Sequence, residues 1–303
     1  MDSLVTTTVI DNVRQLDASR YARIVCMTVI LYDHGITLGR EVELVWKSSW
    51  SLVKALFFAV RYYTLFTGAV ATFGLFYQHM TDNMCTNFAR WDLFTTFVST
   101  VLVQAVLQIR VYAIYARSRL ILLIMALFYA ISIGLAGWIV IIDMSMAKSS
   151  VVTLVPGGQL QGCSFPNLSS KSPILWISPL IFEAILYILV LYKGWQMFRT
   201  TRHLPTHQGS SSGGLLLGIL VRDSVIYFFI LSLIYFSTVI AWGVKDLNGY
   251  IDIMGAFTTT MTGVLGSKMI LNLRHAGTAG SSSTELTGPF SQDVIEFARK
   301  EEC

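Results

Sequence analysis

Charge is scarce in this sequence of 303 residues: only 13% of the residues are Asp, Glu, Lys or Arg, whereas 54% are hydrophobic. A soluble domain needs a more polar surface, so apolar runs of about 18 or more residues are expected to form transmembrane helices. The formal net charge is only +4, which gives no electrostatic reason to expect a nucleic acid or another acidic polymer as a partner. The partner that the composition indicates is the lipid bilayer.

Histidine is also rare, with 5 residues in the whole chain. Only His34 falls inside an expected span, and the sequence contains no HExxH or comparable metal-ligand spacing. A metal-dependent membrane hydrolase needs several histidines and acids within its spans. We therefore expect no metal, no other cofactor and no enzymatic activity.

Seven apolar runs are long enough to cross a hydrocarbon layer of about 30 Å at about 1.5 Å per residue. They cover residues 19–38, 51–77, 91–115, 120–142, 173–194, 219–242 and 251–271. The expected fold is an all-α bundle of seven transmembrane helices (19–274) between an N-terminal segment (1–18) and a flexible cytoplasmic tail (275–303). Residues 1–18 lack the apolar core of a cleavable signal peptide. Asp33 and His34 interrupt the first run, and an alternative with six spans leaves that run out.

The basic residues favour one orientation of this bundle. Lys and Arg are more frequent in the first, third and fifth loops and at the start of the tail than in the other loops. The positive-inside rule then places the N-terminus outside and the C-terminus in the cytoplasm. Asn167, in an Asn-Leu-Ser sequence on the fourth loop, lies outside in this orientation and is expected to carry a glycan. We expect a multi-pass protein of the plasma membrane.

Four cysteines are present, and two of them fall on outer loops. Cys85 precedes the third span and Cys163 lies on the long fourth loop, where disulfides persist. Cys26 is within the first span and Cys303 ends the tail. We therefore predict a disulfide between Cys85 and Cys163; the alternative is two free, half-buried thiols.

Two basic residues lie inside the second span, where an unpaired charge costs several kcal/mol. Lys54 is close enough to the inner end to reach the headgroups, whereas Arg61 is about 15 Å deep at 1.5 Å per residue. Glu183 in the fifth span has a matching depth, so we predict an ion pair between Arg61 and Glu183. Asp33 is nearer the inner surface and is better suited to pair with Lys54.

A second ion pair is predicted at the inner ends of the helices. Arg110 ends the third span in the sequence Ile-Arg-Val-Tyr, and Asp223 lies at the inner start of the sixth. A bridge between them would be a latch between two conformations of the bundle. The alternative is that both side chains are solvated and unpaired.

Small residues recur every four positions along the seventh run: Gly255, Thr259, Gly263 and Ser267. Such a stripe allows another helix to approach closely. We interpret it as a packing face.

The first connecting loop and its flanks carry a distinctive group of residues: Tyr32, Asp33, Thr37, Glu41, Trp46, Lys54, Arg61 and Tyr62. This group resembles the N-terminal signature of a family of basidiomycete fungal membrane proteins that carry a domain of unknown function. The likeness continues at residues 110–113, 222–223 and 271–274, with Ser224 where the family motif would have Gly. The resemblance implies seven helices and no particular reaction.

The sequence favours a heptahelical, receptor-like signalling or sensing protein. Its ligand, a small molecule or a lipid, would enter from outside between the third, fifth, sixth and seventh spans, and a cytoplasmic effector would bind the first, third and fifth loops. No acid precedes Arg110, and neither the sixth nor the seventh span contains Pro, unlike a rhodopsin-like receptor. The alternative is a membrane transporter or lipid-binding protein whose solute faces Arg61 and Glu183.

Overall fold

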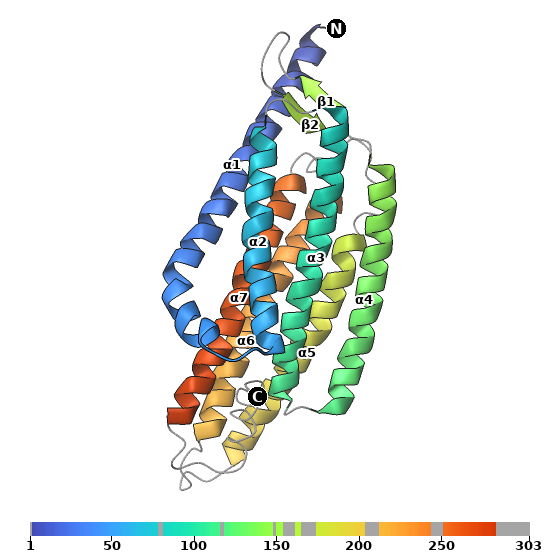
Figure 1. Ribbon diagram of the computed structural model, residues 1–303. Coiled ribbons are helices and arrows are strands. Elements are labelled where there is room, and N and C mark those ends of the chain that lie inside the picture. Colours follow the sequence, from blue (N-terminus) through green and yellow to red (C-terminus); the bar gives the residue numbers. More distant parts are fainter. Residues whose placement is uncertain are drawn as a thin grey trace.

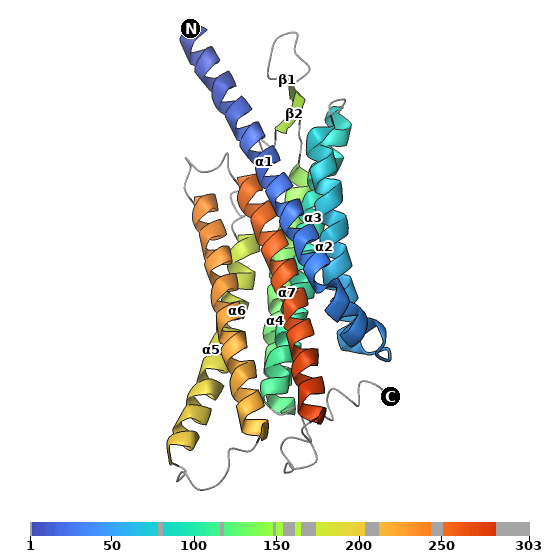
Figure 2. The ribbon, with the colours of Figure 1, turned by 90° about the vertical axis from the view of Figure 1, so that its left-hand side faces the viewer.

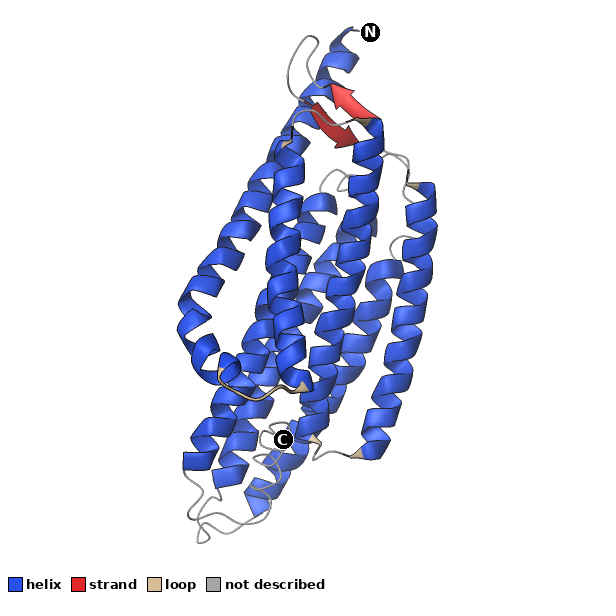
Figure 3. Cartoon of the chain, viewed as in Figure 1, coloured by secondary structure: helices blue, strands red, loops and turns tan. Residues whose placement is uncertain are grey.

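The computed structural model describes residues 2–77, 81–115, 118–147, 150–153, 161–164, 174–203, 212–243 and 251–282. These residues form seven α-helices, one π-helical turn and two short strands (Figures 1 and 3), so the expected all-α class is confirmed. The elements in chain order are α1 (Asp2–Glu41), η1 (Val42–Trp46), α2 (Leu52–Phe76), α3 (Asp82–Ile114), α4 (Arg119–Met146), β1 (Ser150–Thr153), β2 (Gln161–Ser164), α5 (Ile174–His203), α6 (Ser212–Gly243) and α7 (Ile251–Ser282).

Five of the described helices are long and apolar enough to cross a membrane, which indicates a multi-pass membrane protein. They are α2 to α6, and α1 and α7 are too polar to qualify. The charges of these two helices face each other. Arg23 on α1 pairs with Asp252 on α7 at 2.6 Å, and Asp33 on α1 pairs with Lys268 on α7 at 2.8 Å. These two ion pairs form an ionic seam between α1 and α7.

The helices close into a ring in which each packs against the next and α7 packs against α1 (Figures 1 and 2). Further contacts cross the ring: α3 also contacts α5, α6 and α7, and α7 also contacts α2. Large apolar side chains fill the centre. Fully buried side chains come from α2 to α7, and include Phe57, Leu107, Met125, Leu186, Phe228 and Met269.

Several helices extend beyond the apolar runs that predict them. Apolar composition marks the part of a helix suited to lipid, whereas capping residues set where it begins. Thr81 accepts a hydrogen bond from the backbone N–H of Met84, so α3 begins at Asp82 and not at residue 91. At the two ends of the fold, α1 begins at Asp2, within the expected N-terminal segment, and α7 continues to Ser282, within the expected tail.

A short hairpin covers one end of the bundle, near the start of α1 (Figure 3). Strands β1 and β2 pair antiparallel, with Val151 opposite Cys163. Cys163 forms a disulfide with the buried Cys85 in the first turn of α3, with 5.7 Å between the two Cα atoms. The predicted bridge is therefore present and the alternative of two free thiols is wrong. It fixes the hairpin to α3.

Candidate functional site

The chain reverses direction between α1 and α2, and Lys54 stabilises the reversal. Its ammonium donates hydrogen bonds to the backbone carbonyls of Trp46 at 3.1 Å and Ser48 at 2.6 Å, and lies 5.1 Å from the ring centre of Trp50. Lys54 is only 5% exposed. The expectations that it would reach the headgroups or pair with Asp33 are therefore wrong, because the carbonyls of the turn are nearer.

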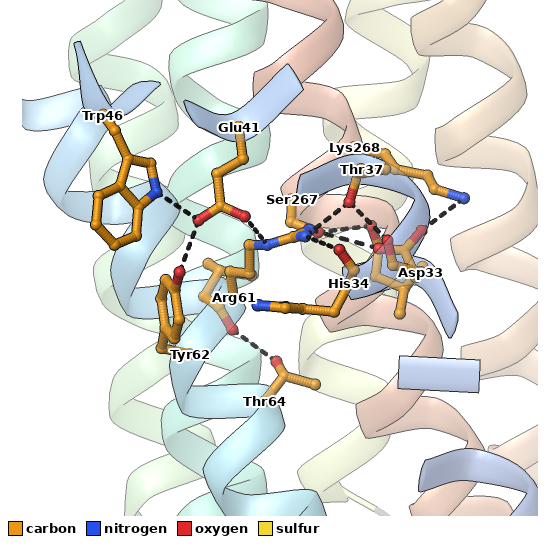
Figure 4. Close-up of polar contacts among 12 residues, drawn as sticks. Asp33, His34, Thr37, Glu41, Trp46, Arg61, Tyr62, Thr64, Ser267 and Lys268 are labelled. Carbon is orange, nitrogen blue, oxygen red and sulfur yellow. Dashed lines mark hydrogen bonds and ion pairs between the residues drawn. The ribbon is translucent and has the colours of Figure 1, made fainter. Parts of the chain in front are cut away.

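Arg61 on α2 is the centre of a buried ionic network (Figure 4). Its Nε lies 2.7 Å from Oε2 of Glu41, its Nη1 lies 3.5 Å from Oδ2 of Asp33, and its Nη2 donates to Oγ1 of Thr37 at 2.6 Å. The three partners are four residues apart on α1, so they lie on one face of that helix. All four side chains are buried. A single face of α1 therefore compensates the Arg61 charge.

The remaining oxygens of the two carboxylates are also engaged. Oε1 of Glu41 accepts hydrogen bonds from Trp46 Nε1 at 3.0 Å and from the Tyr62 hydroxyl at 2.8 Å. Oδ1 of Asp33 pairs with Nζ of Lys268 at 2.8 Å. Two positive and two negative side chains therefore balance within the network. Buried ion pairs are tolerated only with such compensation, and this network joins α1, η1, α2 and α7.

The predicted ion pair between Arg61 and Glu183 is wrong. Helix α2 packs against α1, α3 and α7, whereas α5 packs against α3, α4 and α6. Arg61 and Glu183 have similar depths when residues are counted along their helices, but α2 and α5 are not neighbours in the ring. Glu183 is fully buried, and neither of its carboxylate oxygens has a hydrogen-bond partner among the residues that the structure describes.

The structure brings most of the signature residues together. Seven of the eight contribute to the turn or to the Arg61 network, namely Asp33, Thr37, Glu41, Trp46, Lys54, Arg61 and Tyr62. The exception is Tyr32, which is 68% exposed.

Two basic residues of α7 complete the site, and sequence reasoning missed both roles. Lys268 pairs with Asp33, and Arg274 donates to the Leu44 carbonyl at 2.9 Å and to the Ser51 hydroxyl at 3.1 Å. The only sequence signal for Arg274 was its place in the resemblance at residues 271–274. Pairing between residues so far apart in sequence can be predicted only when the order of the helices in the ring is known.

Arg110 makes a second polar junction, between α3, α6 and α7. Its Nε donates to the Ser224 hydroxyl at 2.6 Å, its Nη1 donates to the Met269 carbonyl at 3.3 Å, and its guanidinium lies 5.6 Å from the ring centre of Tyr227. Ser224 thus supplies a hydrogen-bond acceptor on α6. The side chain of Asp223 lies outside the described residues, so the predicted latch stays a prediction.

A third polar group lies nearer the start of α1. Nη2 of Arg23 is 2.6 Å from Asp252 on α7 and 3.5 Å from Asp92 on α3. Arg23 and Asp92 also line a cavity of about 30 Å³ between α1, α2, α3 and α7. This is not the place between α3, α5, α6 and α7 where we expected a ligand pocket. The predicted glycosylation site, Asn167, lies outside the described part of the chain.

Residues 21–66 match a family of unknown function (DUF6533). No curated protein matches the chain. The matched segment runs along the second half of α1, through η1 and into α2. It contains every charged residue of the Arg61 network except Lys268. The segment that matches the family is therefore the one that forms most of this network.

Proposed function

We propose that this protein is a heptahelical, receptor-like sensor that responds to a small molecule or a lipid. In this proposal all seven helices cross the plasma membrane, the N-terminus and the β1–β2 hairpin lie outside, and the first, third and fifth loops present a cytoplasmic surface to an effector. The distribution of Lys and Arg supports the orientation.

The observation that carries the proposal is the junction at Arg110. A disulfide fixes one end of α3 to the hairpin, and near the other end a guanidinium that is 3% exposed holds both α6 and α7. A hydroxyl on α6 and a carbonyl on α7 accept hydrogen bonds from it. A shift of α6 would exchange the bond to Ser224 for another, which is how a packed bundle can have two discrete states. A ligand that favours one state shifts the population.

The test is a distance measurement between α4 and α6. Spin labels are placed at Leu120 and Ile226, which are 69% and 52% exposed, in full-length protein in lipid nanodiscs with Cys303 replaced by Ser. We expect Ser224→Ala to broaden or shift the distance distribution. The control is Ser237→Ala, because the Ser237 hydroxyl bonds only to the Ile234 carbonyl of its own helix at 2.7 Å. Identical distributions for the wild type and Ser224→Ala would contradict the proposal.

A transporter or lipid-binding protein is the second candidate, and the polar cavity beside α1 favours it. Thr64 lines the cavity and lies one helical turn from Arg61 on α2, so polar groups continue from the cavity into the ionic network. The test is solute flux into liposomes that contain the purified protein. Flux lost in Arg61→Gln, with no change of the α4–α6 distance on adding solute, would favour transport over sensing.

A further inference from the structure

Hydroxyl groups dominate the cavity between α1, α2, α3 and α7. The hydroxyl-bearing residues that line it are Thr64, Thr67, Thr72, Thr95, Thr96, Ser99, Thr259 and Thr260. Its volume of about 30 Å³ has room for a few water molecules or for one ion that keeps some of its water.

Most of these hydroxyls have already engaged their proton. Five of them use their proton on a carbonyl of their own helix, three or four residues earlier, at 2.6 to 3.0 Å: Thr64, Thr67, Thr72, Thr95 and Thr259. A hydroxyl has one proton to donate and two lone pairs. Once the proton is engaged, the oxygen has only lone pairs to offer a ligand, and a ligand that suits such a lining is a cation.

The formal charges beside the cavity indicate the same. Arg23 counts as one positive charge, and its two partners, Asp92 and Asp252, count as two negative charges, so by formal charge the group has one negative charge in excess. The Arg23 side chain is only 11% exposed. The next cation along α1, Arg20, is engaged with the Leu75 carbonyl at 3.1 Å and pairs with Asp17. The Arg61 network, by contrast, is balanced.

We propose that this cavity binds one monovalent inorganic cation, Na⁺ or K⁺. The Asp92 carboxylate and the threonine oxygens are its ligands, since hard cations prefer oxygen donors. The ion neutralises the excess charge and links α1, α2, α3 and α7. The site is independent of the proposed sensing role.

The experiment measures thermal unfolding of the purified full-length protein in NaCl, KCl and N-methylglucamine chloride at equal ionic strength. We expect the unfolding midpoint to rise saturably with Na⁺ or K⁺ but not with the organic cation, which is too large for the cavity. At ten times the dissociation constant, the ratio of folded to unfolded protein should rise about elevenfold. The salt with the larger effect identifies the ion.

Two variants locate the site. Asp92→Asn should abolish the cation effect, and Thr259→Val should weaken it by removing one oxygen. The matched control is Thr262→Val: this hydroxyl also bonds to its own helix, at 2.8 Å from the Thr258 carbonyl, but it does not line the cavity. If Asp92→Asn fails to fold, the difference in cation effect between Thr259→Val and Thr262→Val tests the proposal.

Two results would overturn the proposal. Equal midpoints in the three salts would mean that the cavity holds water only. An unchanged cation response in Thr259→Val and in any folded Asp92→Asn protein would place the ion elsewhere.

Discussion

Glu41 ends α1 and is fully buried, but both oxygens of its carboxylate have partners. Arg61 and Tyr62 approach from α2 and Trp46 from η1, and each contacts one of its two oxygens. A carboxylate with three such partners holds the end of α1, the π-helical turn and the start of α2 in one arrangement. π-helical turns are common at functional sites.

Glu41→Gln should destabilise the protein strongly. Removing one partner of a buried ion pair leaves the other charge uncompensated, at a cost of about 3–5 kcal/mol. Asp33, at 3.5 Å from Arg61, offsets part of this. The measurement is the midpoint of thermal or chemical unfolding in detergent micelles. Glu43→Gln is the control, because Glu43 is exposed, and it should change stability by less than about 0.5 kcal/mol. Equal effects of the two changes would refute the role of Glu41.

At the scale of elements, the small residues of α7 do not share one role. A Cβ built at Gly263 would overlap the side chain of Thr64 on α2, whereas a Cβ at Gly255 meets nothing within 4 Å. The stripe predicted from the sequence is therefore a close contact at one position and open at another. Spacing identifies the face of a helix but not the height at which the neighbour is nearest.

Gly263→Ala and Gly255→Ala should therefore have opposite effects on stability. The first forces α2 and α7 apart, and overpacking of this kind costs about 1–3 kcal/mol. The second has room for the methyl group and gains from the higher helix propensity of Ala, by up to about 1 kcal/mol. Unfolding midpoints of the two variants, measured side by side, check this. A Gly263→Ala protein as stable as the wild type would mean that α2 and α7 are not packed this closely.

The Arg61 network shows what could be predicted at this scale and what could not. The sequence predicted a buried Arg61 that needs an acid. It did not predict that Asp33, Thr37 and Glu41 share a helical face, because the first apolar run ends at residue 38 whereas α1 continues to Glu41. Depth follows from counting residues along a span, so Glu183 was an acceptable partner by depth. The rotation of each helix and the order of the ring come from packing between distant segments, and a single sequence does not contain them.

For the molecule as a whole, the disulfide is the one covalent link between distant parts of the described chain. It joins residues 78 positions apart and ties the hairpin to α3. The seven helices and this bridge followed from hydropathy and cysteine placement. The hairpin did not, because a loop with two strands of four residues each has no strong periodic signal.

Reduction should destabilise the protein by about 2–4 kcal/mol, the usual contribution of a disulfide. The measurement is the unfolding midpoint with and without a reducing agent. The double change Cys85→Ser with Cys163→Ser should lower the midpoint to the reduced value and make it insensitive to the reducing agent. A double variant that still responds to reduction would show that another disulfide is responsible.

The ionic seam between α1 and α7 has a consequence for how the chain is made. A ribosome completes α1 long before α7, and in the interval Arg23 and Asp33 lack the partners, Asp252 and Lys268, that they have in the finished fold. Until α7 is made, Arg23 can pair only with Asp92 on α3 and Asp33 only with Arg61 on α2 among the described residues, each at 3.5 Å. The helix that completes both charge pairs of α1 is therefore the last of the described helices to be synthesised.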